Sequence, residues 1–204
     1  MVARRRRGSV GGGSLLNRMI NRPATNATTT ALMWGIAWLI IGSIVAWYFR
    51  LEPTSMFGYV ASGYIPLWRM TLLHVVIWVV STIIPYIFAV LRNRGVSTME
   101  FFGRMLFAHW PVTLLMIPAL TTDISRRVAY STYMNDVSLC FEQAPIFATL
   151  MTVICAIVLV WWLYWSYRAF SYAQRRGGVL TLLSYIVSMA LSFPLTRMVL
   201  EAIR

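Results

Sequence analysis

Five long apolar stretches dominate this sequence and restrict the folds open to it. A helix needs roughly 17–25 predominantly apolar residues to cross a bilayer. Five stretches reach that length, at about residues 32–49, 70–91, 105–121, 146–167 and 179–197. Charged residues make up only 12% of the chain, whereas soluble domains carry about 25%. The sequence therefore predicts an all-α polytopic membrane protein, folded as a single five-transmembrane-helix bundle.

The stretches divide the chain into a basic arm at residues 1–30 and a membrane domain at residues 31–204. In the arm, the apolar side chains of "SLLNRMINRP" fall on one helical face and Arg18 and Arg22 fall on the other. A short amphipathic helix of this kind lies on an anionic leaflet, and each nearby arginine adds about 1 kcal/mol. Nucleic acid is an unlikely partner, because no aromatic residue interleaves with the arginines to stack on bases.

The distribution of arginine predicts the orientation of the bundle. Basic residues concentrate in cytoplasmic loops. Placing the N-terminus inside and the C-terminus outside puts 12 of the 18 basic residues, all of them arginine, on the inner face. The membrane is expected to be a bacterial inner membrane. An organelle membrane is the alternative, because the arm lacks acidic residues, as transit peptides do.

The inner arginines also predict a recognition surface. Arginine makes bidentate contacts with phosphate and carboxylate groups, so this face suits anionic lipid head groups or an acidic protein. The alternative is that these charges only fix the topology. The residues expected to bind lipid or a partner are Arg4, Arg5, Arg6, Arg7, Arg18, Arg22, Arg92, Arg94, Arg175 and Arg176.

Catalytic groups are scarce, and we expect no catalytic residue, cofactor or metal site. The chain has no lysine, which excludes the P-loop and Schiff-base chemistry. It contains neither an HExxH nor a GxSxG motif. If the third helix begins at Met105, the histidines His74 and His109 differ in depth by about 20 Å, at 1.5 Å per residue. They would then share neither a metal nor a proton.

The start of the third apolar stretch carries a charged pair and a proline. Arg104 precedes the expected helix, so it should snorkel to the inner surface, and Glu100, one turn earlier, is placed to pair with it. Pro111 lies inside the expected helix and leaves the carbonyl of Phe107 without its backbone partner. These residues are therefore interpreted as an entry signal followed by a bent helix.

Small residues at intervals of four predict one helix contact. Such stripes let helix backbones approach closely in lipid. We expect the last two helices to pack antiparallel along two stripes, which are Ala148, Thr152 and Ala156 in the fourth helix and Ser184, Ser188 and Ser192 in the fifth.

The segment "STMEFFGRMLFAHWPVTLL" at residues 97–115 resembles the start of the third helix in the Yip-domain family of Ypt/Rab-interacting membrane proteins, in particular its bacterial branch. The shared pattern of aromatic, small, arginine and proline residues maps onto Phe102, Gly103, Arg104, Ala108 and Pro111. The resemblance covers roughly residues 30–200. It implies a five-helix integral membrane fold without catalytic residues, with trafficking roles in eukaryotic members.

Together these features predict a non-enzymatic membrane scaffold or adaptor. The alternative is a small transporter or channel subunit, which the prolines in the apolar stretches favour. An intramembrane enzyme is a third class, but no acidic pair falls inside an expected helix to support it.

Overall fold

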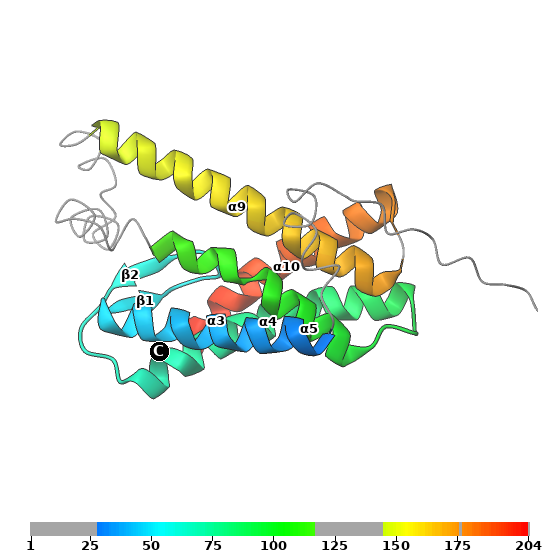
Figure 1. The fold of residues 1–204 in the computed structure, drawn as a ribbon, viewed down its shortest axis with the longest axis horizontal. Coiled ribbons are helices and arrows are strands. Elements are labelled where there is room, and N and C mark those ends of the chain that lie inside the picture. The colour runs from blue at the N-terminus through cyan, green and yellow to red at the C-terminus, as the bar shows by residue number, and fades with distance from the viewer. Residues whose placement is uncertain (1–27, 117–144, 176, 204) are drawn as a thin grey trace, which may run out of the picture.

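The computed structural model describes residues 28–116, 145–175 and 177–203 (Figure 1). Most of the predicted arm lies outside this part of the chain. The described residues form five α-helices, a 3-10 helix and one two-stranded hairpin. The elements in chain order are α3 (Thr28–Tyr48), β1 (Leu51–Pro53), β2 (Tyr59–Ala61), α4 (Leu67–Arg92), α5 (Thr98–Ala108), η1 (Trp110–Met116), α9 (Pro145–Gln174) and α10 (Val179–Ile203).

Four of these helices, α3, α4, α9 and α10, are long and apolar enough to cross a membrane. Large apolar side chains remain exposed along all four of them, as lipid-facing residues would. The prediction of a helical chain with several apolar candidate spans is thereby confirmed, with four such helices among the described residues. The fifth helix, α5, has 11 residues and is too short to cross by itself.

The helices run back and forth between two ends of the bundle. The β1–β2 hairpin lies at one end, and the α4–α5 and α9–α10 turns lie at the other (Figure 1). In the hairpin the strands are antiparallel, with Leu51 opposite Ala61 and Pro53 opposite Tyr59. This hairpin occupies part of the apolar segment between the first two spans, which is too short to cross the bilayer.

The predicted bounds of the third helix were wrong. The structure starts α5 at Thr98, seven residues before Met105, where Ser97 caps the helix by accepting a hydrogen bond from the Glu100 amide at 3.5 Å. The α-helix ends at Ala108 and continues as the 3-10 helix η1. Pro111 explains the change, since proline cannot donate to the helical ladder.

The carbonyl that Pro111 frees does have a partner. The backbone N–H of His109 reaches the carbonyls of both Leu106 and Phe107. A 3-10 bond from the Val112 amide to the His109 carbonyl, at 3.0 Å, then carries the chain onward. The predicted orphan at Phe107 is thus satisfied by a tightened turn, which also fixes the direction of η1.

Helix α3 lies unusually close to α5 and η1 because its facing residues are glycines. A Cβ on Gly35 would stand 2.5 Å from Cγ of Leu106, and one on Gly42 would stand 2.9 Å from Cγ2 of Thr113. At Gly35 a Cβ would also lie 3.0 Å from the backbone nitrogen of Phe107, so this packing requires glycine there, whereas at Gly42 a shift of the Thr113 methyl group would relieve the clash. Small residues therefore bring these backbones together, as predicted for other helices of the bundle.

The last two helices do contact each other, but their predicted small-residue stripes are not the main contact of α10. Ser188 and Ser192 are fully buried, but α10 packs most extensively on α4 rather than on α9. Thr152 and Ala156 of the α9 stripe are exposed, and the side chain of Ala148 lies outside the described ones. Helix α9 contacts α10 through its C-terminal half, where the Tyr185 hydroxyl donates to the Leu163 carbonyl at 3.2 Å, while the N-terminal half of α9 extends away from the bundle (Figure 1).

Candidate functional site

Charged groups gather at the end of the bundle where α4 and α9 end and α5 begins, which we call the arginine end. Three of the arginines predicted to bind lipid or a partner are described, namely Arg92, Arg94 and Arg175. The others lie outside the described residues, and they are Arg4, Arg5, Arg6, Arg7, Arg18, Arg22 and Arg176.

Arg92 holds two helices together instead of facing outward. Its Nη1 donates to Oγ of Ser184 at 2.9 Å, which links the end of α4 to the beginning of α10. Next to it, Nδ2 of Asn93 donates to the carbonyl of Gln174 at 3.0 Å and joins α4 to α9. Arg94 is exposed in the turn that follows. The hydrogen bond of Arg92 gives this predicted site residue a structural role.

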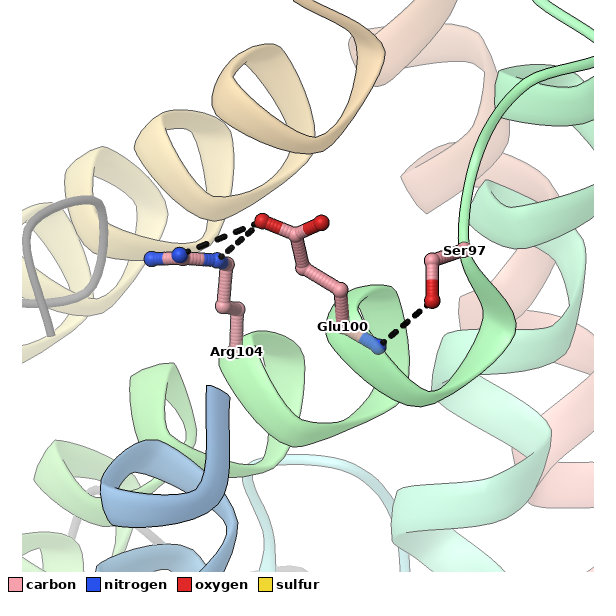
Figure 2. A network of polar contacts seen from close by, with 3 residues as sticks. All are labelled: Ser97, Glu100 and Arg104. Atoms are coloured by element: carbon pink, nitrogen blue, oxygen red, sulfur yellow. Dashed lines mark hydrogen bonds and ion pairs between the residues drawn. The ribbon is translucent and has the colours of Figure 1, made fainter. Parts of the chain in front are cut away.

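The pair predicted between Glu100 and Arg104 is confirmed, but its location differs. Oε1 of Glu100 accepts from Nε of Arg104 at 3.3 Å and lies 3.2 Å from Nη2 (Figure 2). Arg104 is only 4% exposed, so it does not snorkel to the surface. The reason is the early start of α5, which places Arg104 in the second turn of that helix.

A second group compensates for the burial of this charge. The guanidinium carbon of Arg104 lies 4.2 Å from the centre of the Tyr172 ring, on α9. Such cation–π contacts strengthen when the cation is shielded from water. Arg104 therefore joins α5 to α9, with a carboxylate on one helix and an aromatic face on the other.

A groove of about 600 Å³ opens beside this pair. Its walls come from α5, from the last two turns of α9 and from the turn that follows, with the lining residues Glu100, Arg168, Ser171, Tyr172, Arg175 and Gly177. Nε of Arg168 is buried and has no hydrogen-bond partner among the described residues. A buried charged donor is costly unless an acceptor reaches it, so the unsatisfied Nε distinguishes Arg168 from the other residues that line the groove.

Arg175 adopts a backbone conformation that favours glycine. Its φ is 53°, at the position directly after the last residue of α9, and the structure also places Gly178 at a φ of 101°. Left-handed φ values are uncommon outside glycine, and such strain often occurs at functional sites. Arginine at this position puts a second cation on the groove.

The second polar region lies inside the bundle and was not predicted. His74 and His109 line one cavity of about 40 Å³, together with Tyr59, Trp78 and aliphatic and aromatic side chains. We name it the histidine cavity. The expected separation of about 20 Å was therefore wrong. Starting α5 seven residues earlier moves His109 deeper by about 10 Å, at 1.5 Å per residue, and so brings it towards His74.

Hydrogen bonds fix both imidazole rings. His74 Nδ1 donates to the Met70 carbonyl at 2.9 Å, and its Nε2 lies 3.3 Å from the Tyr59 hydroxyl. Nδ1 of His109 accepts from the indole N–H of Trp162 at 3.3 Å. Burial raises the pKa of the Tyr59 phenol above its ordinary value, so this residue stays a neutral hydroxyl.

Sequence reasoning counted Arg168 on the inner face but did not select it, and it missed Tyr172 altogether. Both follow from helical spacing, since Arg168 and Tyr172 are four residues apart and Arg175 is three further on. That signal was available, but the apolar stretch was taken to end at residue 167, whereas α9 continues to Gln174.

No family model, curated protein or solved structure matches this chain.

Proposed function

We propose that this protein is a non-enzymatic membrane scaffold or adaptor whose arginine end binds the phosphate of an anionic lipid. One observation carries the proposal: Arg168 lines the groove, and its buried Nε has no hydrogen-bond partner in the part of the chain that the structure describes. A phosphate has the acceptor oxygens that such a donor requires, and it binds arginine more readily than a neutral head group does.

The charges around the groove support an anion. Glu100 already pairs with Arg104, so Arg168 and Arg175 leave the groove positively charged. Ligand sites usually have volumes of roughly 300–1,000 Å³, and the groove has about 600 Å³. It can therefore admit a head group larger than a free phosphate ion.

The position of the groove favours a lipid over an acidic protein. It lies at the C-terminal end of α9, one of the four candidate spans. The ends of a spanning helix lie at the level of the lipid head groups. A lipid phosphate is thus available there at high local concentration, whereas an acidic protein would have to reach the groove past the bilayer surface.

Lipid binding to variants in nanodiscs tests the proposal. We expect Arg168→Gln to weaken the binding of fluorescent phosphatidylglycerol about tenfold, because a hydrogen bond to a charged group contributes about 1.5–3 kcal/mol. Phosphatidylcholine has the same phosphate but also a choline cation, which the positively charged groove repels, so its binding should be weaker from the outset and change less. Arg94→Gln is the matched control, since it removes one exposed arginine at the same end without touching the groove.

Equal losses in the two variants would mean that diffuse charge attracts the lipid, and the groove would not be its site. Competition distinguishes the sources of the anion. Inorganic phosphate that displaced the labelled lipid would indicate that the groove recognises phosphate alone. An acidic peptide that displaced it more effectively than unlabelled phosphatidylglycerol would favour a protein partner over the lipid.

The alternative function, a small transporter or channel subunit, also has an observation in its favour. Prolines occur inside α4 and α10, at Pro85 and Pro194, and the histidine cavity lies between the helices. Its volume of about 40 Å³ is far below that of ordinary ligand sites, roughly 300–1,000 Å³, and this favours the scaffold.

Membership of the Yip-domain family remains a prediction from the pattern at residues 97–115.

A further inference from the structure

The histidine cavity carries an inference independent of the proposed lipid site. Two of the residues that line it, Trp78 and His109, each have a buried ring nitrogen, Nε1 and Nε2 respectively, with no hydrogen-bond partner among the described residues. Leaving one buried donor unsatisfied costs about 1–3 kcal/mol. Two such donors on the same cavity indicate a common acceptor.

The hydrogen bonds around the cavity determine which atoms carry protons. A backbone carbonyl only accepts, so Nδ1 of His74 bears a proton, and its Nε2 accepts from the Tyr59 hydroxyl. An indole N–H only donates, so Nδ1 of His109 is an acceptor. In the neutral ring of His109 the proton is then on Nε2, which makes that atom a donor to the cavity.

These assignments define the ligand that fits. It must accept hydrogen bonds from His109 and Trp78, and it can donate one to the oxygen of Tyr59, whose own proton is directed to His74. A hydroxyl group does all of this with one oxygen atom. Buried waters typically make about three hydrogen bonds, which is the number available here.

Charge and volume narrow the choice further. None of the described residues that line the cavity carries a charged side chain, and an isolated ion is very costly to bury without a counterion. A cavity needs about 10–15 Å³ to hold one water, so about 40 Å³ admits a few waters or one small alcohol. The ligand is therefore neutral and small.

We propose that the histidine cavity binds a hydroxyl ligand, either internal water or a small alcohol, that bridges His109 and Trp78 to Tyr59. The ligand completes a hydrogen-bonded chain from Trp162 on α9, through His109, to the hairpin and His74 on α4. It thereby connects three elements that meet at the bend between α5 and η1 and stabilises that bend.

Water-edited solid-state NMR of the full chain in bilayers tests this proposal. With 15N-labelled histidine and tryptophan, we expect magnetisation from water to reach Nε1 of Trp78 and Nε2 of His109. The chain provides an internal control, because Nε1 of Trp165 is also buried and unpaired among the described residues but does not line the cavity. Its transfer should be several-fold slower.

Two features keep the assignment secure. The chain has only two histidines, and the proposal gives them different tautomers, Nδ1–H for His74 and Nε2–H for His109. With 13C added to the histidine label, correlating each protonated nitrogen with its neighbouring ring carbons tells Nδ1–H from Nε2–H and separates the two residues without any variant. Trp78→Phe identifies the Trp78 signal, and it should also slow water transfer to His109, because the shared ligand loses one of its hydrogen bonds.

A second arm adds 13C-methanol to distinguish the two sources of the hydroxyl. Transfer from water that methanol does not displace supports an internal water. Transfer from methanol carbon to both nitrogens supports a small alcohol. If neither source reaches Trp78 and His109 faster than it reaches Trp165, the cavity is dry and the proposal is wrong. An Nε2-unprotonated neutral His109 would overturn it as well.

Discussion

The arginine end and the histidine cavity are both polar regions of an apolar bundle, but they satisfy their polar groups differently. At the arginine end the charge of Arg104 is buried between a carboxylate and an aromatic ring. The described residues that line the cavity are all neutral, and two of them have a ring N–H without a hydrogen-bond partner in that part of the chain. In the first region the buried charge of Arg104 is paired within the protein and Arg168 is left for the proposed lipid phosphate, whereas the second region depends on a small neutral ligand.

The difference follows from depth. Near a helix end, long side chains and lipid head groups can complete the coordination of a charge, so arginine is tolerated there. In the interior a charge would cost several kcal/mol or more, so neutral histidine, tyrosine and tryptophan supply the polar atoms. The two regions should consequently respond very differently to the loss of one partner.

The largest expected effect comes from Glu100→Gln. The change removes the carboxylate beside the buried guanidinium of Arg104, and it should lower the free energy of unfolding by about 3 kcal/mol. Breaking a buried pair costs about 3–5 kcal/mol, and the value falls at the low end because the Glu100 side chain is 26% exposed and Arg104 keeps its contact with the Tyr172 ring. Titration with SDS from mild detergent micelles measures it.

The bundle contains a matched control for that prediction. Arg197 and Glu201 also form a pair four residues apart, at 2.8 Å, but their side chains are 66% and 56% exposed. Exposed pairs contribute about 0–1 kcal/mol, so Glu201→Gln should change the stability by less than about 1 kcal/mol. Similar losses in the two variants would show that burial does not distinguish these pairs.

The next largest effect concerns the wall of the histidine cavity. Gly35→Ala places a Cβ 2.5 Å from Leu106, and overpacking of this kind costs about 1–3 kcal/mol. Alanine recovers up to about 1 kcal/mol of helix propensity, so we expect a net loss of about 1 kcal/mol in the SDS titration. Gly63→Ala is the control, since a Cβ there has no neighbour within 4 Å. If Gly35→Ala is as stable as Gly63→Ala, the close approach of α3 to α5 does not determine the packing.

The contrast between the two regions also explains which features could be predicted from the sequence and which could not. The candidate spans follow from hydropathy alone, and the gathering of arginines at one end follows from their positions in the loops. The cavity required the depth of His109, which depends on where α5 begins. Arg104 was taken as the surface residue that precedes the helix, whereas the structure starts the helix at Thr98. Because the predicted start of this helix was seven residues too late, the two histidines were expected at different depths, although they line one cavity.

Helix partners were predicted less well, for a related reason. A stripe of small residues shows that a helix face can be approached closely, but it does not select the helix that approaches. The serine stripe of α10 is buried as such a face should be, yet it packs mainly on α4. The glycines of α3 that permit the closest approach are seven residues apart, at Gly35 and Gly42, and the search for spacings of four did not find them.

The smallest expected effect tests what sets the start of α5, and therefore the depth of the cavity. Ser97→Ala removes the capping hydroxyl that accepts from the Glu100 amide (Figure 2). Because this bond is long, at 3.5 Å, the loss in the free energy of unfolding should be only about 0.5 kcal/mol, the lower end for an N-cap.

Hydrogen exchange is the sharper measurement, since the Glu100 amide should exchange faster while the amides of η1 do not change. Ser62→Ala is the control, because the hydroxyl of Ser62 bonds only the exposed carbonyl of Gly63. Unchanged exchange at Glu100 would mean that the buried pair with Arg104, rather than the cap, fixes where α5 begins, and the arginine end would then also set the position of His109.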